Sequence, residues 1–152
     1  QARSGDRYHH RDVGYNYRMT NLNAAVGLAQ LERLPEMLAT KKQIALRYQR
    51  AAKDHPQLSP QPTGDGHSWW MSGVRTESQA EALSLSEFMR DNGIDARVFW
   101  ESLSHQPAYA AFPKGDTPNA DAISGTIVAL PCSTSLTPLE QDHVIEVLAK
   151  WR

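Results

Sequence analysis

The amino-acid sequence predicts an α+β fold in which a small sheet is covered on one face by helices. Apolar residues recur at helical spacing through most of 21–54, which predicts a long first helix. Short apolar or aromatic runs at 68–74, 94–99 and 127–130 predict strands. Helical patterns between and after these runs favour helices and a small sheet that share one core.

The first helix begins after Thr20, whose hydroxyl can accept a hydrogen bond from an unpaired amide of the first turn. Pro35 has no amide hydrogen, and its ring crowds the carbonyl one turn earlier. We therefore expect a kink at Pro35, or a division into two helices at about 21–33 and 35–54. The three prolines and two glycines of 55–66 predict a loop.

Two further helices have recognisable ends. A helix over about 77–91 ends at Asn92-Gly93, where glycine supplies the left-handed residue. The segment 101–119 shows no period. The last helix has a capping box of Thr137 and Glu140 with Pro138 at the first helical position. Its predicted buried stripe consists of Val144, Ile145, Leu148 and Trp151.

Composition narrows the classes of function. The 152 residues are enough for about one domain, and the net charge of −1 argues against nucleic-acid binding. No apolar run approaches the roughly 20 residues of a membrane span, and Cys132 is the only cysteine. We expect a cytoplasmic protein. Because the chain starts at Gln1 and not at a methionine, we also expect either a piece cut from a longer chain or a mature fragment.

The richest chemical segment is 8–18, which packs aromatic, basic and amide side chains before the first helix. Arg18 offers a planar fork of donors for phosphate or carboxylate, and Asn16 can donate and accept. This pattern indicates a surface for a polar, anionic ligand. A solvated, tyrosine-rich linker is the alternative. Adjacent His9 and His10 are a weak metal signal, because sequence neighbours rarely face one ion, so we predict no metal site.

Four ordered blocks resemble the DegT/DnrJ/EryC1/StrS family of pyridoxal-phosphate (PLP) sugar aminotransferases. They are His10 with Gly14-Tyr15-Asn16-Tyr17-Arg18-Met19-Thr20-Asn21-Leu22, Ala24-Ala25, Gly27-Leu28 and Gln30-Leu31; Trp70-Met71; Gly93-Ile94, Arg97 and Gln106-Pro107 with Tyr109; and Leu130-Pro131-Cys132, Leu136-Thr137, Gln141-Asp142 and Val144-Ile145. The resemblance covers nearly the whole chain.

The resemblance implies the C-terminal small domain of a fold-type I aminotransferase, with an active-site and interface segment at 1–19 and the domain proper at 20–152. Asn16 is expected to reach the PLP phosphate of the partner subunit in a homodimer. Arg18 is expected near the same cofactor, although an interface ion pair is its alternative role. Substrate contacts are implied for Tyr8, His10 and Tyr15.

One departure from the family pattern affects a substrate contact. The family often has Pro-Leu-His before its Gln-Pro motif, whereas this chain has Ser102-Leu103-Ser104-His105. The histidine is therefore displaced by one position. Ser104 and His105 are both candidates for substrate binding, and a surface histidine is the alternative for His105.

PLP chemistry needs a lysine bonded to the cofactor, and the family places it upstream of the segment matched here. We interpret all the lysines of this chain as solvated charges, namely Lys41, Lys42, Lys53, Lys114 and Lys150. The resemblance therefore implies the C-terminal part of an enzyme that transfers an amino group from glutamate to a nucleotide-linked keto-sugar. This part is expected to be inactive alone. Two alternatives stay open, a stand-alone dimerisation or ligand-binding domain and a relative acting on an amino-cyclitol or aromatic precursor.

Overall fold

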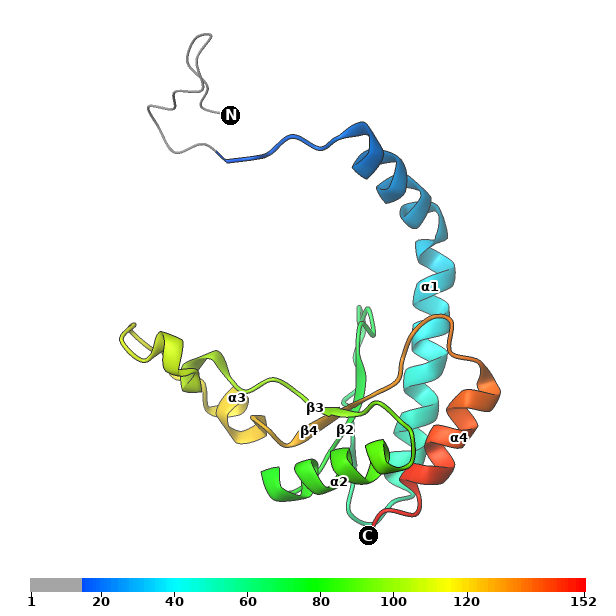
Figure 1. The fold of residues 1–152 in the computed structure, drawn as a ribbon, viewed down its shortest axis with the longest axis vertical. Coiled ribbons are helices and arrows are strands. Elements are labelled where there is room, and N and C mark those ends of the chain that lie inside the picture. Colours follow the sequence, from blue (N-terminus) through cyan, green and yellow to red (C-terminus); the bar gives the residue numbers. More distant parts are fainter. Residues whose placement is uncertain (1–14) are drawn as a thin grey trace. The chain divides into compact units, whose positions relative to one another are not determined.

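The structure, a computed structural model, describes residues 15–152, so Tyr8 and His10 lie outside the described residues. The chain forms two compact units, one ending at Pro35 and one beginning at Glu36. This structural boundary differs from the functional boundary predicted between 1–19 and 20–152, which stays a prediction. In order, the helices and strands are α1 (Asn21–Lys53), β1 (Ser59–Pro60), β2 (Ser72–Arg75), α2 (Gln79–Asp91), β3 (Arg97–Val98), α3 (Pro118–Ile123), β4 (Ile127–Leu130) and α4 (Pro138–Leu148) (Figure 1).

Helix α1 begins as predicted. The Asn23 amide donates to Thr20 Oγ1 at 3.2 Å, so the threonine caps the first turn. The helix then continues through Pro35 to Lys53 as one element, and the prediction of two separate helices is wrong. A proline removes one backbone hydrogen bond from the ladder, while the turns on either side keep theirs. Pro35 instead coincides with the boundary between the compact units.

The sheet has four strands in the order β1-β2-β4-β3, and each neighbouring pair is antiparallel. Ser72 pairs with Leu130, and Val98 with Val128. Side chains alternate between the two faces, so that Val74 and Val128 are buried on one of them. Gly73 is required at its position, because a Cβ there would lie 2.6 Å from the Val128 carbonyl oxygen.

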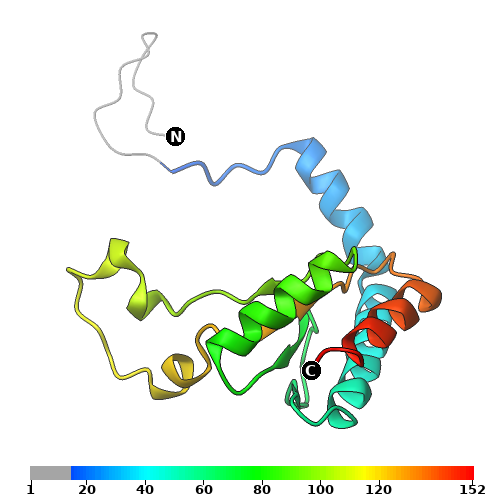
Figure 2. The ribbon, with the colours of Figure 1, turned by 60° about the horizontal axis from the view of Figure 1, so that its bottom comes forward.

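The hydrophobic core lies on the face of the sheet that carries Val74 and Val128, and three helices cover it. Figures 1 and 2 show α2 against the sheet and α4 beside the C-terminal half of α1. Arg47 of α1 forms an ion pair with Asp142 of α4, and Gln141 donates to the Ile44 carbonyl at 2.8 Å. The α+β prediction is thereby confirmed. Core residues from the helices are Ile44, Tyr48, Ala52, Ala82, Leu85, Met89, Val144, Val147 and Leu148.

Both helix ends predicted from local signals are present. Gly93 follows α2 with φ of +79°, in the left-handed region that glycine adopts at low cost. Helix α4 has the expected capping box of Thr137 and Glu140. The box at the start of α2, formed by Ser78 and Glu81, was not predicted, although it has the same sequence spacing.

Two predicted strands are shorter than expected. Strand β2 begins at Ser72, not at residue 68, because Trp69 has a φ of +53° and interrupts the extended backbone. Strand β3 contains Arg97 and Val98 alone, since the chain is still turning after α2, where the Ala96 amide donates to the Ile94 carbonyl at 2.9 Å.

Two segments predicted to be irregular contain short elements. Strand β1 lies inside the expected loop 55–66 and pairs with β2 at the sheet edge, where Pro60 needs no ladder hydrogen bond. The 3-10 turns Leu103–His105 and Pro107–Tyr109 fall in 101–119, and α3 follows. Within residues 15–152, no helix combines the length and apolar composition needed to cross a membrane.

Candidate functional site

The first candidate site is the extended segment that leads into α1. Tyr15 and Tyr17 are exposed, and their ring centroids lie 5.9 Å apart. The Arg18 amide donates to Asn16 Oδ1 at 3.4 Å, which folds the asparagine side chain against the backbone. Within the described residues, no partner engages the Asn16 amide hydrogens or the Arg18 guanidinium. Three predicted site residues, Tyr15, Asn16 and Arg18, are therefore exposed together.

These donors suit a phosphate group. A guanidinium and a carboxamide can both donate to phosphate oxygens, and the guanidinium also supplies charge. They fit the phosphate end of PLP, but a covalent cofactor also needs a lysine, and the sequence of the unit that ends at Pro35 contains none. The segment can therefore anchor an anion without performing chemistry on it.

The second candidate site is the lobe between β3 and β4, which holds Ser104 and His105. Ser104 Oγ donates to Asp121 Oδ1 at 2.8 Å, and Thr117 Oγ1 donates to Asp121 Oδ2 at 2.9 Å. His105 Nε2 lies 3.2 Å from Asp121 Oδ1. Hydrogen bonds from Ser104 and Thr117 lower the pKa of Asp121, because they stabilise its charged form. One carboxylate thus organises the lobe, a role that sequence spacing did not reveal.

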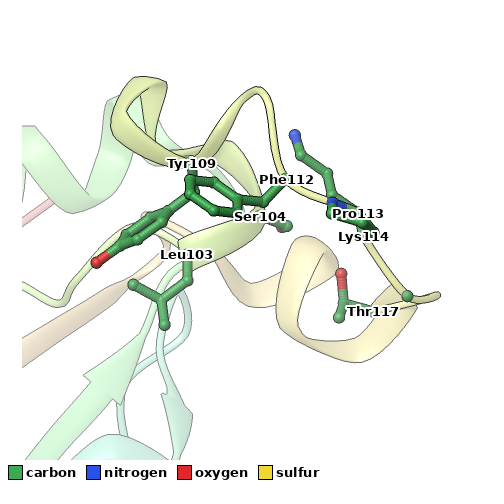
Figure 3. Close-up of a pocket in the computed structure, with 8 residues that line it drawn as sticks. Leu103, Ser104, Tyr109, Phe112, Pro113, Lys114 and Thr117 are labelled. Carbon is green, nitrogen blue, oxygen red and sulfur yellow. The ribbon is translucent and has the colours of Figure 1, made fainter.

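A hollow of about 290 Å³ lies next to this network (Figure 3). Ser104 lines it, whereas His105 is turned to Asp121 and does not. Figure 3 shows Tyr109, Phe112 and Lys114 on the turns that follow Ser104. The ring centroids of Tyr109 and Phe112 lie 6.2 Å apart in an edge-to-face arrangement. The hollow therefore combines aromatic walls, the hydroxyl groups of Ser104 and Thr117, and one cationic side chain.

A third group of contacts surrounds Lys41. Its ammonium group donates to the Trp70 carbonyl at 2.8 Å and to the Cys132 carbonyl at 2.6 Å. It also lies 3.5 Å from Cys132 Sγ. The interpretation of Lys41 as a solvated charge is therefore wrong, because its half-buried side chain joins α1 to the segments before β2 and after β4. This lysine is held by the protein and is not poised to bond a cofactor.

The tryptophans near Lys41 differ sharply in exposure. Trp69 is 7% exposed, whereas Trp70 and Trp100 are each 66% exposed. The left-handed backbone at Trp69 costs roughly 1–2 kcal/mol for a residue with a side chain. It turns one indole inward and the next outward. The sequence assigned Trp69 and Trp70 to an aromatic strand, and Trp70 also to the family resemblance, but the difference in exposure between the two adjacent tryptophans was not predicted.

The structure thus gathers the predicted residues into two groups. Tyr15, Asn16 and Arg18 belong to the compact unit that ends at Pro35, and Ser104 and His105 to the one that begins at Glu36. Among residues 15–152, no group of three or more histidine, cysteine or acidic side chains is arranged to hold a metal ion.

Comparison with known proteins identifies the family. The profile of the DegT/DnrJ/EryC1/StrS aminotransferase family matches residues 1–149. The chain is 37% identical over 109 residues to GDP-perosamine synthase of Vibrio cholerae, covering 70% of this chain and 30% of the relative. It is 33% identical over 144 residues to GDP-perosamine synthase of Escherichia coli O157:H7, covering 95% and 39% respectively. The chain thus spans well under half the length of these relatives.

A solved structure gives the same result for the fold. DesV of S. venezuelae, determined in complex with a ketimine intermediate, superposes with a TM-score of 0.78 at 26% identity, covering 97% of this chain and 40% of DesV. Sequence profile, relatives and fold agree over almost the entire chain. This chain therefore belongs to the DegT/DnrJ/EryC1/StrS aminotransferase family, a family of PLP-dependent enzymes.

Proposed function

We propose that this chain is the C-terminal part of an aminotransferase that transfers an amino group, with glutamate as the donor, to a nucleotide-linked keto-sugar. The observation that carries the proposal is a sequence identity of 33–37% to two relatives named GDP-perosamine synthase. Their name refers to a sugar linked to a nucleoside diphosphate. The proposed enzyme works in the cytoplasm as a homodimer with a shared active site. Its catalytic lysine lies in the part of the protein outside this chain.

The proposed contribution of this chain is binding and positioning. Asn16 and Arg18 donate hydrogen bonds to the cofactor phosphate, and Arg18 also neutralises its charge. PLP, when bound, supplies the electron sink for amino transfer. Substrate contacts are proposed for Tyr15, for the Ser104 hydroxyl, and for Tyr8, His10 and His105. Fixing anions and a sugar ring in place lowers the entropic part of the barrier.

The test is amination by the whole enzyme. Purified full-length protein is incubated with PLP, glutamate and a GDP-linked keto-sugar, and mass spectrometry follows the conversion of the keto-sugar to the amino-sugar. We expect conversion that depends on glutamate. An enzyme that retains PLP and accepts glutamate, yet aminates no nucleotide-linked keto-sugar, would contradict the proposal.

Asn16→Ala tests the role of the first candidate site in the same enzyme. Loss of a hydrogen bond to a charged group corresponds to about a ten-fold or greater loss of PLP affinity. Retained PLP is measured by its absorbance after dialysis. Asn23→Ala is the matched control, because Asn23 is also an exposed asparagine, and it should retain the cofactor.

A further inference from the structure

Trp70 and Trp100 form an exposed aromatic pair in the unit that begins at Glu36. Their ring centroids lie 5.7 Å apart, and the ring planes are inclined by 44°. Each residue is 66% exposed, so most of both indoles faces solvent. Neither residue belongs to the hydrophobic core, whereas the other two tryptophans, Trp69 and Trp151, are buried at 7% and 4% exposure.

Several contacts hold this pair in place. Lys41 Nζ binds the carbonyl oxygen of Trp70 at 2.8 Å. The preceding residue, Trp69, has a φ of +53°, a conformation that L residues with side chains rarely adopt. On the other side, the Phe99 amide donates to the Ile127 carbonyl at 2.6 Å, and the Phe99 ring packs edge-on against Trp100 at 5.1 Å. The backbone beside both tryptophans is therefore held in place, and the Phe99 ring supports the Trp100 indole.

Strained backbone and fixed, solvent-facing aromatic rings are features of ligand sites more than of packing. Indole faces bind flat heteroaromatic rings, because base–aromatic stacking removes both surfaces from water. A nucleotide-linked sugar carries one such ring, its base. The two indoles contact each other, so a base would stack on the open face of one indole with its edge toward the other.

We propose that Trp70 and Trp100 bind the base of the nucleotide-linked substrate. This assignment rests on the proposed function, from which it takes the nucleotide. It names two residues that determine nucleotide affinity, separate from the residues proposed to contact the cofactor and the sugar.

GDP binding to this chain tests the proposal directly. Titration with GDP is followed by tryptophan emission and by calorimetry, with inorganic pyrophosphate as the probe that lacks a base. We expect saturable quenching with GDP and none with pyrophosphate. Trp70→Ala and Trp100→Ala should each weaken GDP binding by about ten-fold, which is within the range for loss of one stacked aromatic ring. Trp70→Phe and Trp100→Phe should restore most of the affinity.

Leu139→Ala is the matched control, because Leu139 is an apolar residue that is 80% exposed. It should leave GDP affinity unchanged. Absence of GDP binding, or equal affinity in the alanine variants, would overturn the proposal. A second result would also overturn the proposal. In the whole enzyme, the alanine variants would lower the melting temperature and leave the KM for the GDP-linked sugar unchanged. The pair would then be covered by another part of the protein. If only the assignment of the tryptophan pair is wrong, the unsubstituted enzyme still aminates the GDP-linked keto-sugar. If the proposed function is wrong, the unsubstituted enzyme does not aminate it.

Discussion

At the scale of single residues, Lys41 shows how one cation can join segments that lie far apart in the chain. Its ammonium group binds carbonyl oxygens of Trp70 and Cys132, which precede β2 and follow β4 respectively. Charge-assisted hydrogen bonds of this kind are stronger than neutral ones. Without this ammonium group, the Trp70 carbonyl would keep only the weak donor Cys132 Sγ at 3.9 Å, and the Cys132 carbonyl would lose its charged donor.

Lys41→Met should lower the free energy of unfolding by about 1–2 kcal/mol, because both carbonyls lose their charged donor while the apolar stem is kept. Chemical denaturation measures the change. The control is Lys42→Met on the adjacent, exposed position of the same helix, for which we expect a change within about 0.5 kcal/mol. Equal effects of the two substitutions would show that the Lys41 contacts do not stabilise the fold.

Asp121 gives the lobe between β3 and β4 a dependence on acid pH. Its folded-state pKa is lowered, chiefly by the Ser104 hydrogen bond, so its stabilising contribution is full above the ordinary carboxyl pKa of about 4. The contribution disappears as the pH falls through the lowered folded-state pKa. Exchange of the His105 and Asp121 amides, which donate to the Ser102 and Thr117 carbonyls at 2.9 Å, should therefore accelerate below about pH 4 relative to its intrinsic rate.

Asp121→Asn should remove this acid transition and expose the lobe amides to faster exchange at neutral pH. Asp116→Asn, a neighbouring carboxylate without a hydrogen bond to Ser104 or Thr117 in the structure, should keep it. An acid transition that persists unchanged in Asp121→Asn would assign the pH dependence to another group.

At the scale of elements, the sheet depends on close approach of β2 and β4. Gly73→Ala places a Cβ 2.6 Å from the Val128 carbonyl oxygen, so the strands must shift. We expect a loss of about 1–3 kcal/mol in the free energy of unfolding, which is typical of overpacking. Gly115→Ala is the control, because nothing lies within 4 Å of its added methyl group. Equal stability of the two variants would mean that β2 and β4 are more loosely paired than described.

The capping box at the start of α4 allows the contribution of one helix cap to the free energy of unfolding to be measured. Thr137 Oγ1 accepts a hydrogen bond from the Glu140 amide, and the Glu140 carboxylate accepts one from the Thr137 amide at 2.8 Å. Thr137→Ala should cost about 1 kcal/mol. Thr137→Ser keeps the acceptor and should restore most of it. If serine and alanine are equally destabilising in thermal unfolding, the threonine methyl group matters more than the cap.

The features that the sequence predicted well are those decided by neighbours in the chain. The cap at Thr137, the left-handed Gly93 and the apolar strand 127–130 all follow rules that span a few residues. Strand β2 begins at Ser72, later than predicted, because the backbone of Trp69 has a positive φ. The next residue, Trp70, is held by Lys41, which lies far away in the sequence. Asp121 accepts hydrogen bonds from Ser104, 17 residues earlier in the sequence, and from Thr117, four residues earlier. No local sequence pattern predicts such a network.

The candidate site divides in the same way. Tyr15, Asn16 and Arg18 were predicted from one continuous segment, and the structure places all three in an exposed, extended stretch. Their roles toward cofactor and substrate stay predictions. The pair Trp70 and Trp100 was not predicted, because its two members approach each other through the fold of the sheet.

At the scale of the whole molecule, this chain is a family member that covers 30–39% of the length of two relatives. We therefore propose that this chain binds and positions cofactor and substrate, and that the rest of the enzyme carries the covalent chemistry on the cofactor. The five lysines are the groups that could refute this division. Lys41 is engaged by two carbonyls, and the others are exposed, namely Lys42, Lys53, Lys114 and Lys150.

The most direct test is the intact mass of this chain after incubation with PLP and borohydride, which converts any imine between lysine and cofactor into a stable bond. We predict no stoichiometric adduct on this chain, while the full-length enzyme gains one cofactor per subunit at a lysine outside it. A single stoichiometric adduct at one lysine of the 152-residue chain would contradict the account, because this chain would then carry the catalytic lysine itself.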